Sequence, residues 1–226
     1  MVSASRILPL VIAVCFTIGM PTSLRAVGEP LGLGVLLGPC LPSSSVADVY
    51  KALDTLRGLQ SYLRPSNEGF HIGGRVRFGL SESVSFSGGM GFYRFPGQSQ
   101  IVILDSGQGY MLQTATTFVP ITAGVTMYAF RGLIAPYATV EGTYTYRHVS
   151  VTSGNTTLED IIVSAAQTEL EPSTARIGAA IAVGLQADIG GLKPFAEVRY
   201  NLTNLIGAGR GESQISFVTV SLGLFL

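Results

Sequence analysis

Residues 174–189 alternate between two kinds of side chain, and this alternation is the strongest constraint on how the chain can fold. One face is apolar and consists of Ala175, Ile177, Ala179, Ile181, Val183, Leu185, Ala187 and Ile189. The other face is smaller or polar and consists of Arg176, Gly178, Ala180, Ala182, Gly184, Gln186 and Asp188. Successive side chains of a strand point to opposite faces, so this pattern predicts a long β-strand between two different environments.

The same period of two recurs along the chain and predicts eight strands. They cover residues 30–39, 69–80, 84–95, 115–130, 133–150, 174–189, 192–203 and 213–226. Most reach the roughly 9–11 residues that a tilted strand needs to cross a bilayer. Short links at 81–83, 131–132 and 190–191 alternate with much longer ones, as in outer-membrane barrels. The sequence therefore predicts an all-β fold, an eight-stranded antiparallel up-and-down transmembrane β-barrel.

The composition indicates which face of this barrel meets lipid. Charged residues make up 12% of the chain, against about 25% in a typical soluble domain, and the lysines are Lys51 and Lys193 alone. A soluble lipocalin-like carrier needs a polar exterior around an apolar interior, which so few charges would cover poorly. We therefore expect the apolar faces to meet lipid and the polar faces to line a narrow lumen that side chains fill.

Seven charged residues of the polar faces are expected to pair inside the lumen. They are Arg75, Arg77, Arg176 and Arg199, set against Glu141, Glu197 and Asp188. Each unpaired ion buried there would cost several kcal/mol, so pairing is expected and the network is interpreted as structural. An ion path or proton relay is the alternative, which so narrow a lumen disfavours. We predict no catalytic residue, metal site or cofactor. Cys15 lies in the apolar stretch of the N-terminus, so Cys40 stands alone in the barrel domain, without a disulfide framework.

The N-terminus has the pattern of a secretory signal peptide over residues 1–26. Arg6 precedes an apolar stretch from Ile7 to Met20, and a cleavage site could follow Ala26. The barrel domain would then occupy residues 27–226. Basic and acidic residues balance at a formal net charge of zero, which argues against a nucleic-acid partner, since that would require a basic stripe.

Two further features concern the rim that carries the long loops. Residues 45–63 place Val46, Val49, Tyr50, Leu53 and Leu56 at helical spacing behind a possible N-cap. They predict a short amphipathic helix in the first long loop. In addition, Tyr93, Tyr144 and Tyr146 fall near the loop ends of their strands, where an aromatic girdle is expected.

Three motifs carry a resemblance to a known family. They are Phe118-Val119-Pro120-Ile121-Thr122-Ala123-Gly124-Val125, then Pro136-Tyr137, and Lys193-Pro194-Phe195-Ala196-Glu197. Over residues 28–226 the chain resembles the small Gram-negative outer-membrane β-barrel domain proteins, the eight-stranded group akin to outer membrane protein X. The alternation of residues 218–226 resembles the C-terminal signature read by the barrel assembly machinery, although Phe225 is penultimate where Phe is usually last. The resemblance implies an outer-membrane location among lipids and lipopolysaccharide.

The leading functional expectation is a non-enzymatic outer-membrane protein with a structural or surface-contact role. An enzyme is the main competing hypothesis, because His148-Val149-Ser150 is similar to the His-x-Ser of the eight-stranded lipid A deacylases. There a histidine base activates a serine nucleophile, and here Glu159 or Asp160 would have to orient the histidine. A barrel could also serve as a small pore or as a lipocalin-like carrier of apolar ligands.

Overall fold

A computed structural model describes residues 31–43, 46, 68–96, 100–103, 109–153, 173–206 and 214–226 of the 226-residue chain. The strands are β1 (Gly32–Pro42), β2 (Gly69–Gly79), β3 (Val84–Pro96), β4 (Gln100–Ile103), β5 (Gly109–Tyr128), β6 (Ile134–Ser153), β7 (Ser173–Ala187), β8 (Lys193–Ile206) and β9 (Ser216–Phe225). All except β4 correspond to the eight strands predicted from the alternation.

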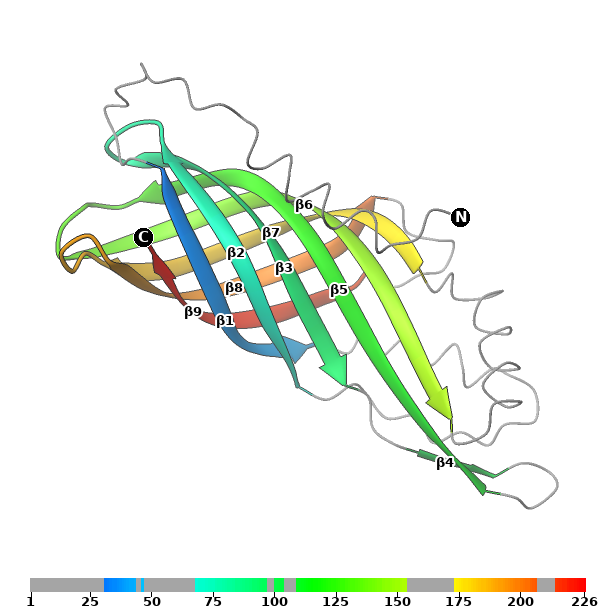
Figure 1. Ribbon diagram of the computed structural model, residues 1–226. Helices are drawn as coiled ribbons and strands as arrows, with labels where there is room; N and C mark the ends of the chain where they lie inside the picture. The colour runs from blue at the N-terminus through cyan, green and yellow to red at the C-terminus, as the bar shows by residue number, and fades with distance from the viewer. Residues whose placement is uncertain are drawn as a thin grey trace.

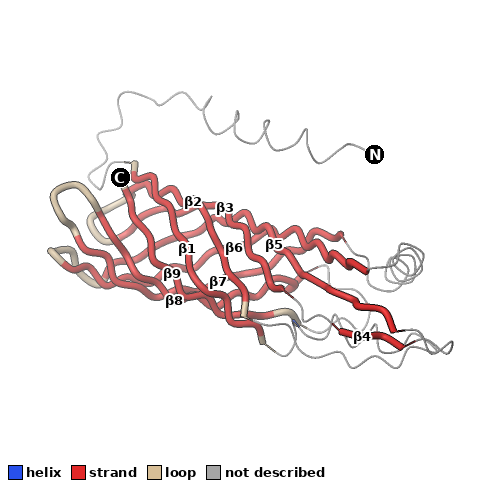
Figure 2. The backbone as a smooth tube through the Cα atoms, turned by 60° about the horizontal axis from the view of Figure 1, so that its bottom comes forward, coloured by secondary structure: helices blue, strands red, loops and turns tan. Residues whose placement is uncertain are grey.

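Eight strands close into an antiparallel barrel. Hydrogen-bonded neighbours follow the order β3-β2-β1-β9-β8-β7-β6-β5, and a pairing between β3 and β5 joins the two ends of this row. The strands are steeply tilted around the barrel axis (Figure 1). The short turns gather at one end, where the C-terminus also lies (Figure 2). The predicted all-β, eight-stranded antiparallel up-and-down fold is confirmed.

One hairpin differs from the sequence-based expectation. β4 pairs with residues 109–112 of β5, and β5 pairs with β6 as far as Leu112 and Ser153. β5 and β6 therefore run past the other strands, with β4 on the projecting edge (Figure 1). The predicted start of this strand at residue 115 was wrong because Tyr110-Met111-Leu112 is a continuous apolar run without alternation.

The turn between β7 and β8 depends on its two glycines. Gly190 has φ +61° and Gly191 has φ +96°, a region that residues with a side chain rarely adopt. Ile189 and Leu192 exchange two backbone hydrogen bonds of 2.9 and 3.3 Å on either side of them. Positive φ at both central residues of a two-residue link matches the right-handed twist of the flanking strands, so the predicted turn at 190–191 is confirmed.

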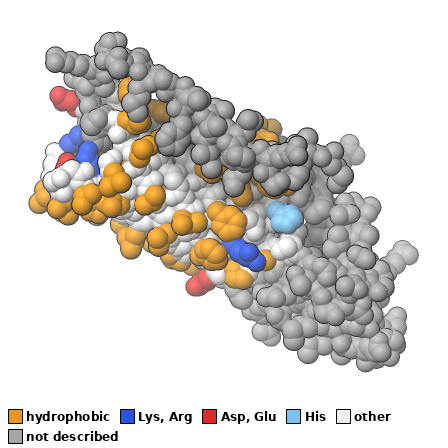
Figure 3. Space-filling view, in the orientation of Figure 1, with side chains coloured by type: hydrophobic (Ala, Val, Ile, Leu, Met, Phe, Trp, Pro, Cys, Tyr) orange, Lys and Arg blue, Asp and Glu red, His pale blue; other side chains and the backbone are white. Residues whose placement is uncertain are grey.

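The exterior of the barrel is an apolar band. Its large side chains are 45% to 65% exposed at Val35, Leu37, Phe70, Ile72, Val140, Tyr144, Tyr146, Ile181, Val183, Leu185, Val198, Tyr200 and Leu222. Hydrophobic side chains are spread over the visible wall, and charged ones show toward its two ends (Figure 3). Soluble monomers rarely expose so much contiguous apolar surface. Within the part of the chain that the structure describes, no helix is long and apolar enough to span a membrane.

The interior has the opposite character. Buried polar or charged side chains point inward from β2, β3 and β5 to β9, and include His71, Arg75, Ser87, Thr126, Glu141, Gln186, Glu197, Arg199 and Thr219. This polar interior within an apolar exterior is the inverse of a lipocalin-like carrier. It agrees with the orientation inferred from the scarcity of charge.

Glycines on the inner wall make room for the large rings of the lumen. A Cβ atom on Gly223 would overlap the Phe195 ring, and one on Gly184 would meet the Tyr137 ring at 2.5 Å. Real Cβ contacts are not found so close. At these two of the 28 glycines, the missing side chain therefore leaves the space that an aromatic ring occupies inside the barrel.

Three expectations about the rim and the N-terminus have different outcomes. Tyr144 and Tyr146 are exposed on the outer face, but Tyr93 is buried inside the lumen at 5% exposure, so its assignment to the girdle was wrong. Tyr93 has inward parity on β3, and its ring covers Gly91. The helix predicted over residues 45–63 lies outside the described residues except for the buried Val46. The signal peptide predicted over 1–26 lies outside them as well.

Candidate functional site in the lumen

Glu197 is the centre of a buried ionic network inside the barrel. Its two oxygens accept hydrogen bonds of 2.6 and 3.0 Å from the Nη1 and Nη2 atoms of Arg75. Arg199 donates to it from Nε at 3.1 Å, and the Tyr137 hydroxyl donates at 3.1 Å. Charge-assisted bidentate bonds are among the strongest hydrogen bonds in proteins, so Glu197 ties β2, β6 and β8 together.

Arg199 extends the network across the lumen to Glu141. Its Nη1 lies 2.5 Å from Glu141 Oε2, and the other oxygen of Glu141 accepts from Ser87 at 3.0 Å. The network thus links β2, β8, β6 and β3, and it contains two arginines and two glutamates. Both glutamate side chains are fully buried. Since the formal charges cancel, the group avoids the large cost of an uncompensated buried ion.

Arg77 does not join this network, contrary to the expectation that it pairs with a carboxylate. Its Nη1 donates to Gln186 Oε1 at 2.7 Å and to the Tyr128 hydroxyl at 3.0 Å. The centre of its guanidinium lies 4.5 Å from the Tyr137 ring and 4.4 Å from the Phe225 ring. Arginine stacks favourably on aromatic faces, so uncharged groups take the place of the expected carboxylate.

Asp188 and Arg176 also lie outside the network. β7 ends at Ala187, so Asp188 falls in the turn, where it is exposed and its backbone N–H donates to the Leu133 carbonyl. Arg176 has inward parity but is only half-buried, and its Nη1 donates to the Ala175 carbonyl at 3.4 Å. It lies six residues along β7 from Ala182, the register partner of Arg199, which is about 20 Å at the usual strand rise.

Aromatic clusters fill the lumen on both sides of the network. Toward the short turns the buried cluster is Leu36, Tyr128, Ala135, Tyr137, Phe195 and Phe225. Toward the loops it is Cys40, Val46, Tyr93, Phe95, Phe118, Ile215 and Phe217. In the second cluster the Phe217 ring lies 5.2 Å from Phe95, 5.5 Å from Tyr93 and 5.6 Å from Phe118. The lumen is therefore packed in three successive layers, aromatic, ionic and aromatic.

A small polar cluster beneath the loop-side rings was missed in the sequence. His71 Nε2 lies 2.9 Å from Ser221 Oγ, and His71 Nδ1 lies 3.4 Å from Cys40 Sγ. The His71 ring stacks on Tyr93 with centroids 5.2 Å apart. All of these side chains have inward parity, which the alternation could have indicated, although their closeness depends on the register. Among the described residues no three His, Cys, Asp or Glu side chains are placed to hold a metal ion.

The His148 and Ser150 pair of the enzyme hypothesis lies on the outer face of β6. His148 is exposed and Ser150 is half-buried. The Ser150 hydroxyl donates to the Ala115 carbonyl at 3.3 Å, so its proton is directed at the backbone of β5. A serine nucleophile is activated when its hydroxyl donates to a base, and here that hydroxyl is engaged elsewhere. Glu159 and Asp160 lie outside the described residues.

Comparison with known proteins places the fold. No protein-family model and no curated protein matches the chain. Among solved structures, it is similar to Neisserial surface protein A, with 13% identity, 88% of this chain and 97% of that chain covered, and a TM-score of 0.54. Ail of Yersinia pestis is 11% identical, with 88% of this chain and 100% of that chain covered and a TM-score of 0.43. The N-terminal β-barrel domain of Pseudomonas aeruginosa OprF is 10% identical, with 88% of this chain and 98% of that chain covered and a TM-score of 0.41. The closed barrel, its apolar exterior and its likeness to Neisserial surface protein A give the chain the fold of the small eight-stranded outer-membrane β-barrel proteins.

Proposed function

We propose that the protein is an integral outer-membrane barrel with a non-enzymatic role, in which a plugged, rigid barrel holds the long loops at the cell surface. The observation that carries this proposal is the combination of an apolar exterior with a lumen packed in three layers. A barrel of this kind stabilises itself in lipid, because closure leaves no strand edge unpaired. Contacts with other molecules at the cell surface would then be made by the long loops that the barrel holds.

The filled lumen supports a closed barrel rather than a pore. The rings of Phe95, Phe118 and Phe217 pack against one another beneath the loops. The ionic network spans the middle of the lumen, and the cavity beside Arg75 and Arg199 measures about 10 Å³, about the space of one water molecule. An ion crossing this route would have to displace paired charges and packed rings together.

The partners that we propose follow from the two surfaces of the barrel. Membrane lipid and the acyl chains of lipopolysaccharide would cover the apolar band. The barrel assembly machinery would read the last strand, where Val220 and Leu222 point outward. The exposed Tyr144 and Tyr146 would lie at the membrane interface, where aromatic side chains are enriched.

Fractionation with heat-modifiable gel migration and planar-bilayer recording test this proposal together. We expect the full-length protein in the outer-membrane fraction, with a gel migration that shifts on boiling, and no steady single-channel conductance after reconstitution. A stable conductance would overturn the plugged barrel. Acyl release from lipid A or phospholipid that disappears in Ser150→Ala would overturn the non-enzymatic role.

A further inference from the structure

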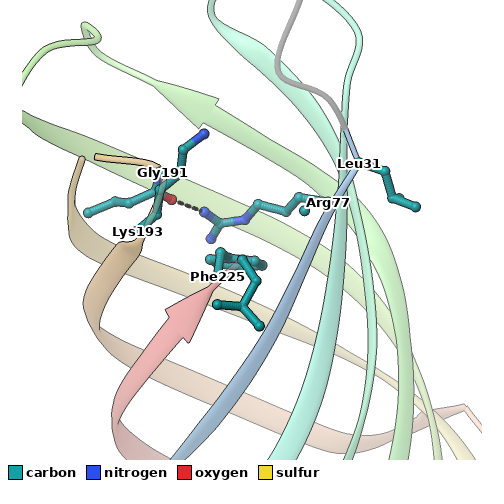
Figure 4. Close-up of a pocket in the computed structure, with 8 residues that line it drawn as sticks. Leu31, Arg77, Gly191, Lys193 and Phe225 are labelled. Atoms are coloured by element: carbon teal, nitrogen blue, oxygen red, sulfur yellow. Dashed lines mark hydrogen bonds between the residues drawn. The ribbon is translucent and has the colours of Figure 1, made fainter. Parts of the chain in front are cut away.

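The short-turn end of the barrel contains a cavity of about 220 Å³ that the proposed function does not use. It is lined by Leu31, Gly32, Arg77, Gln186, Gly191, Lys193, Phe225 and Leu226. Figure 4 shows the Arg77 guanidinium extending into this cavity above Phe225, with Gly191 and Lys193 on the opposite side. The cavity therefore combines a deep cationic group with apolar walls.

The arrangement around Arg77 leaves one edge of its guanidinium without a partner. Arg77 is 3% exposed. Its guanidinium lies over the Tyr137 and Phe225 rings, and its Nη1 is engaged by Gln186 and Tyr128. The Nε and Nη2 atoms have no hydrogen-bond partner among the described residues, and each has less than 1 Å² of accessible surface, so a ligand reaches them only if the side chains that cover them shift. These two atoms share one edge of the guanidinium, and such an edge matches the two oxygens of a carboxylate or phosphate.

The charges around the short-turn mouth favour an anion. Lys193 lines the same cavity, and Arg131 lines an adjoining one of about 510 Å³ that shares Gln186 and Lys193 with the first. The opposing charged side chain is Asp188, which lines the adjoining cavity. Among the side chains in the described lining of the two cavities, three cations therefore face one anion. Arg77 is the deepest of them, and electrostatic interactions are stronger in such a desolvated place than in water.

We propose that this cavity binds a small amphipathic carboxylate, whose two oxygens engage Nε and Nη2 of Arg77 and whose short apolar tail lies among Leu31, Phe225 and Leu226. A carboxylate fits better than a bare inorganic anion because most of the lining outside Arg77, Gln186 and Lys193 is apolar or glycine. The ligand would enter from the side of the short turns.

Titration of the refolded full chain with hexanoate tests the proposal. The protein is kept in a nonionic maltoside detergent, so that the detergent supplies no competing anion. Calorimetry reports binding, and the ¹H–¹⁵N signal of Arg77 Nε–H reports its place. We expect saturable binding of hexanoate with a shift of that signal, a weaker effect of inorganic phosphate, and no saturation with hexan-1-ol, which has the tail without the charge.

Three variants distinguish a bidentate contact with Arg77 from a general attraction of the anion to the cations around the cavity. Arg77→Lys keeps the charge but removes the fork, and should weaken hexanoate binding about tenfold or more. Arg131→Gln removes a cation of the adjoining cavity and should change the affinity by less than about threefold, because exposed charges act weakly. Gly32→Leu leaves Arg77 intact and should abolish binding by filling the cavity, since a Cβ there meets Phe225 at an ordinary 3.5 Å.

Several results would overturn the site. They are the absence of saturable hexanoate binding to the wild-type chain, equal binding of hexan-1-ol, and unchanged affinity in Arg77→Lys. If Arg77→Lys fails to fold, Gly32→Leu decides the matter alone, because undiminished binding by that variant would place the ligand elsewhere.

Discussion

Neutralising Glu197 should destabilise the barrel strongly, and Glu197→Gln is the sharpest form of this change because it preserves the shape of the side chain. Glu197 accepts both hydrogen bonds that Arg75 donates and one of the two that Arg199 donates. Without its charge, two buried guanidinium groups face the single carboxylate of Glu141. Removing one partner of a buried ion pair typically costs about 3–5 kcal/mol, and we expect a loss of stability in this range.

A compensating double variant should recover most of that loss. Arg75→Met combined with Glu197→Gln leaves Arg199 and Glu141 as a balanced pair, and replacing a buried ion pair by uncharged side chains of similar volume is often nearly neutral. We therefore expect the double variant to lie within about 1–2 kcal/mol of the wild-type protein. The control is Glu82→Gln in the exposed turn between β2 and β3, which should change stability by no more than about 0.5 kcal/mol.

Equilibrium unfolding in urea from lipid vesicles measures these differences, with heat-modifiable gel migration reporting the folded fraction. If Glu197→Gln proved as stable as Glu82→Gln, the buried charges of the network would not be coupled. The same would follow if the double variant proved less stable than Glu197→Gln alone.

Three other predictions concern the packing of the wall and the lumen. Gly223→Ala should destabilise the barrel by about 1–3 kcal/mol because the added methyl group meets the Phe195 ring, whereas Gly142→Ala on the outer face meets nothing nearer than 3.9 Å and should be neutral in the same unfolding assay. Ile181→Arg in the apolar band should cost about 2–4 kcal/mol, as charged substitutions do at the bilayer midplane, against at most about 1 kcal/mol for Leu133→Arg in an exposed turn. In a chain with Cys15 replaced by serine, Cys40 is the single cysteine and is fully buried, so a maleimide should label it only after unfolding in urea, and rapid labelling of the folded protein would contradict the packed lumen.

Much of the fold was predictable from the alternation of side chains. A strand whose two faces meet lipid and lumen must alternate, so residues 174–189 indicated β7 almost to the residue, and Gly190-Gly191 indicated the turn after it. The projecting hairpin of β4 and β5 was not predictable in this way. Residues 110–112 form a continuous apolar run in the sequence, so the period-two pattern that marks a barrel strand disappears there.

The partners within the lumen were much harder to predict than its charges. Alternation places Arg75, Arg77 and Glu197 inside the barrel, but which arginine meets which glutamate depends on the stagger between strands far apart in the sequence. Asp188 has the inward parity of β7 and yet lies beyond the end of that strand. One nitrogen of Arg77 donates to the uncharged Gln186 and Tyr128, and its guanidinium lies over aromatic rings. A count of opposite charges in the sequence does not reveal such an arrangement.

The chain contains no tryptophan, so one introduced tryptophan can report directly whether the apolar band faces lipid or water. Val140→Trp places the probe on the outer face of β6, and Leu133→Trp places it in the turn before β6. In vesicles of lipids brominated near mid-chain, we predict strong fluorescence quenching for Val140→Trp and little for Leu133→Trp, with the reverse order for quenching by aqueous iodide. If iodide quenched Val140→Trp and brominated lipid did not, the apolar band would face water and the account would be contradicted.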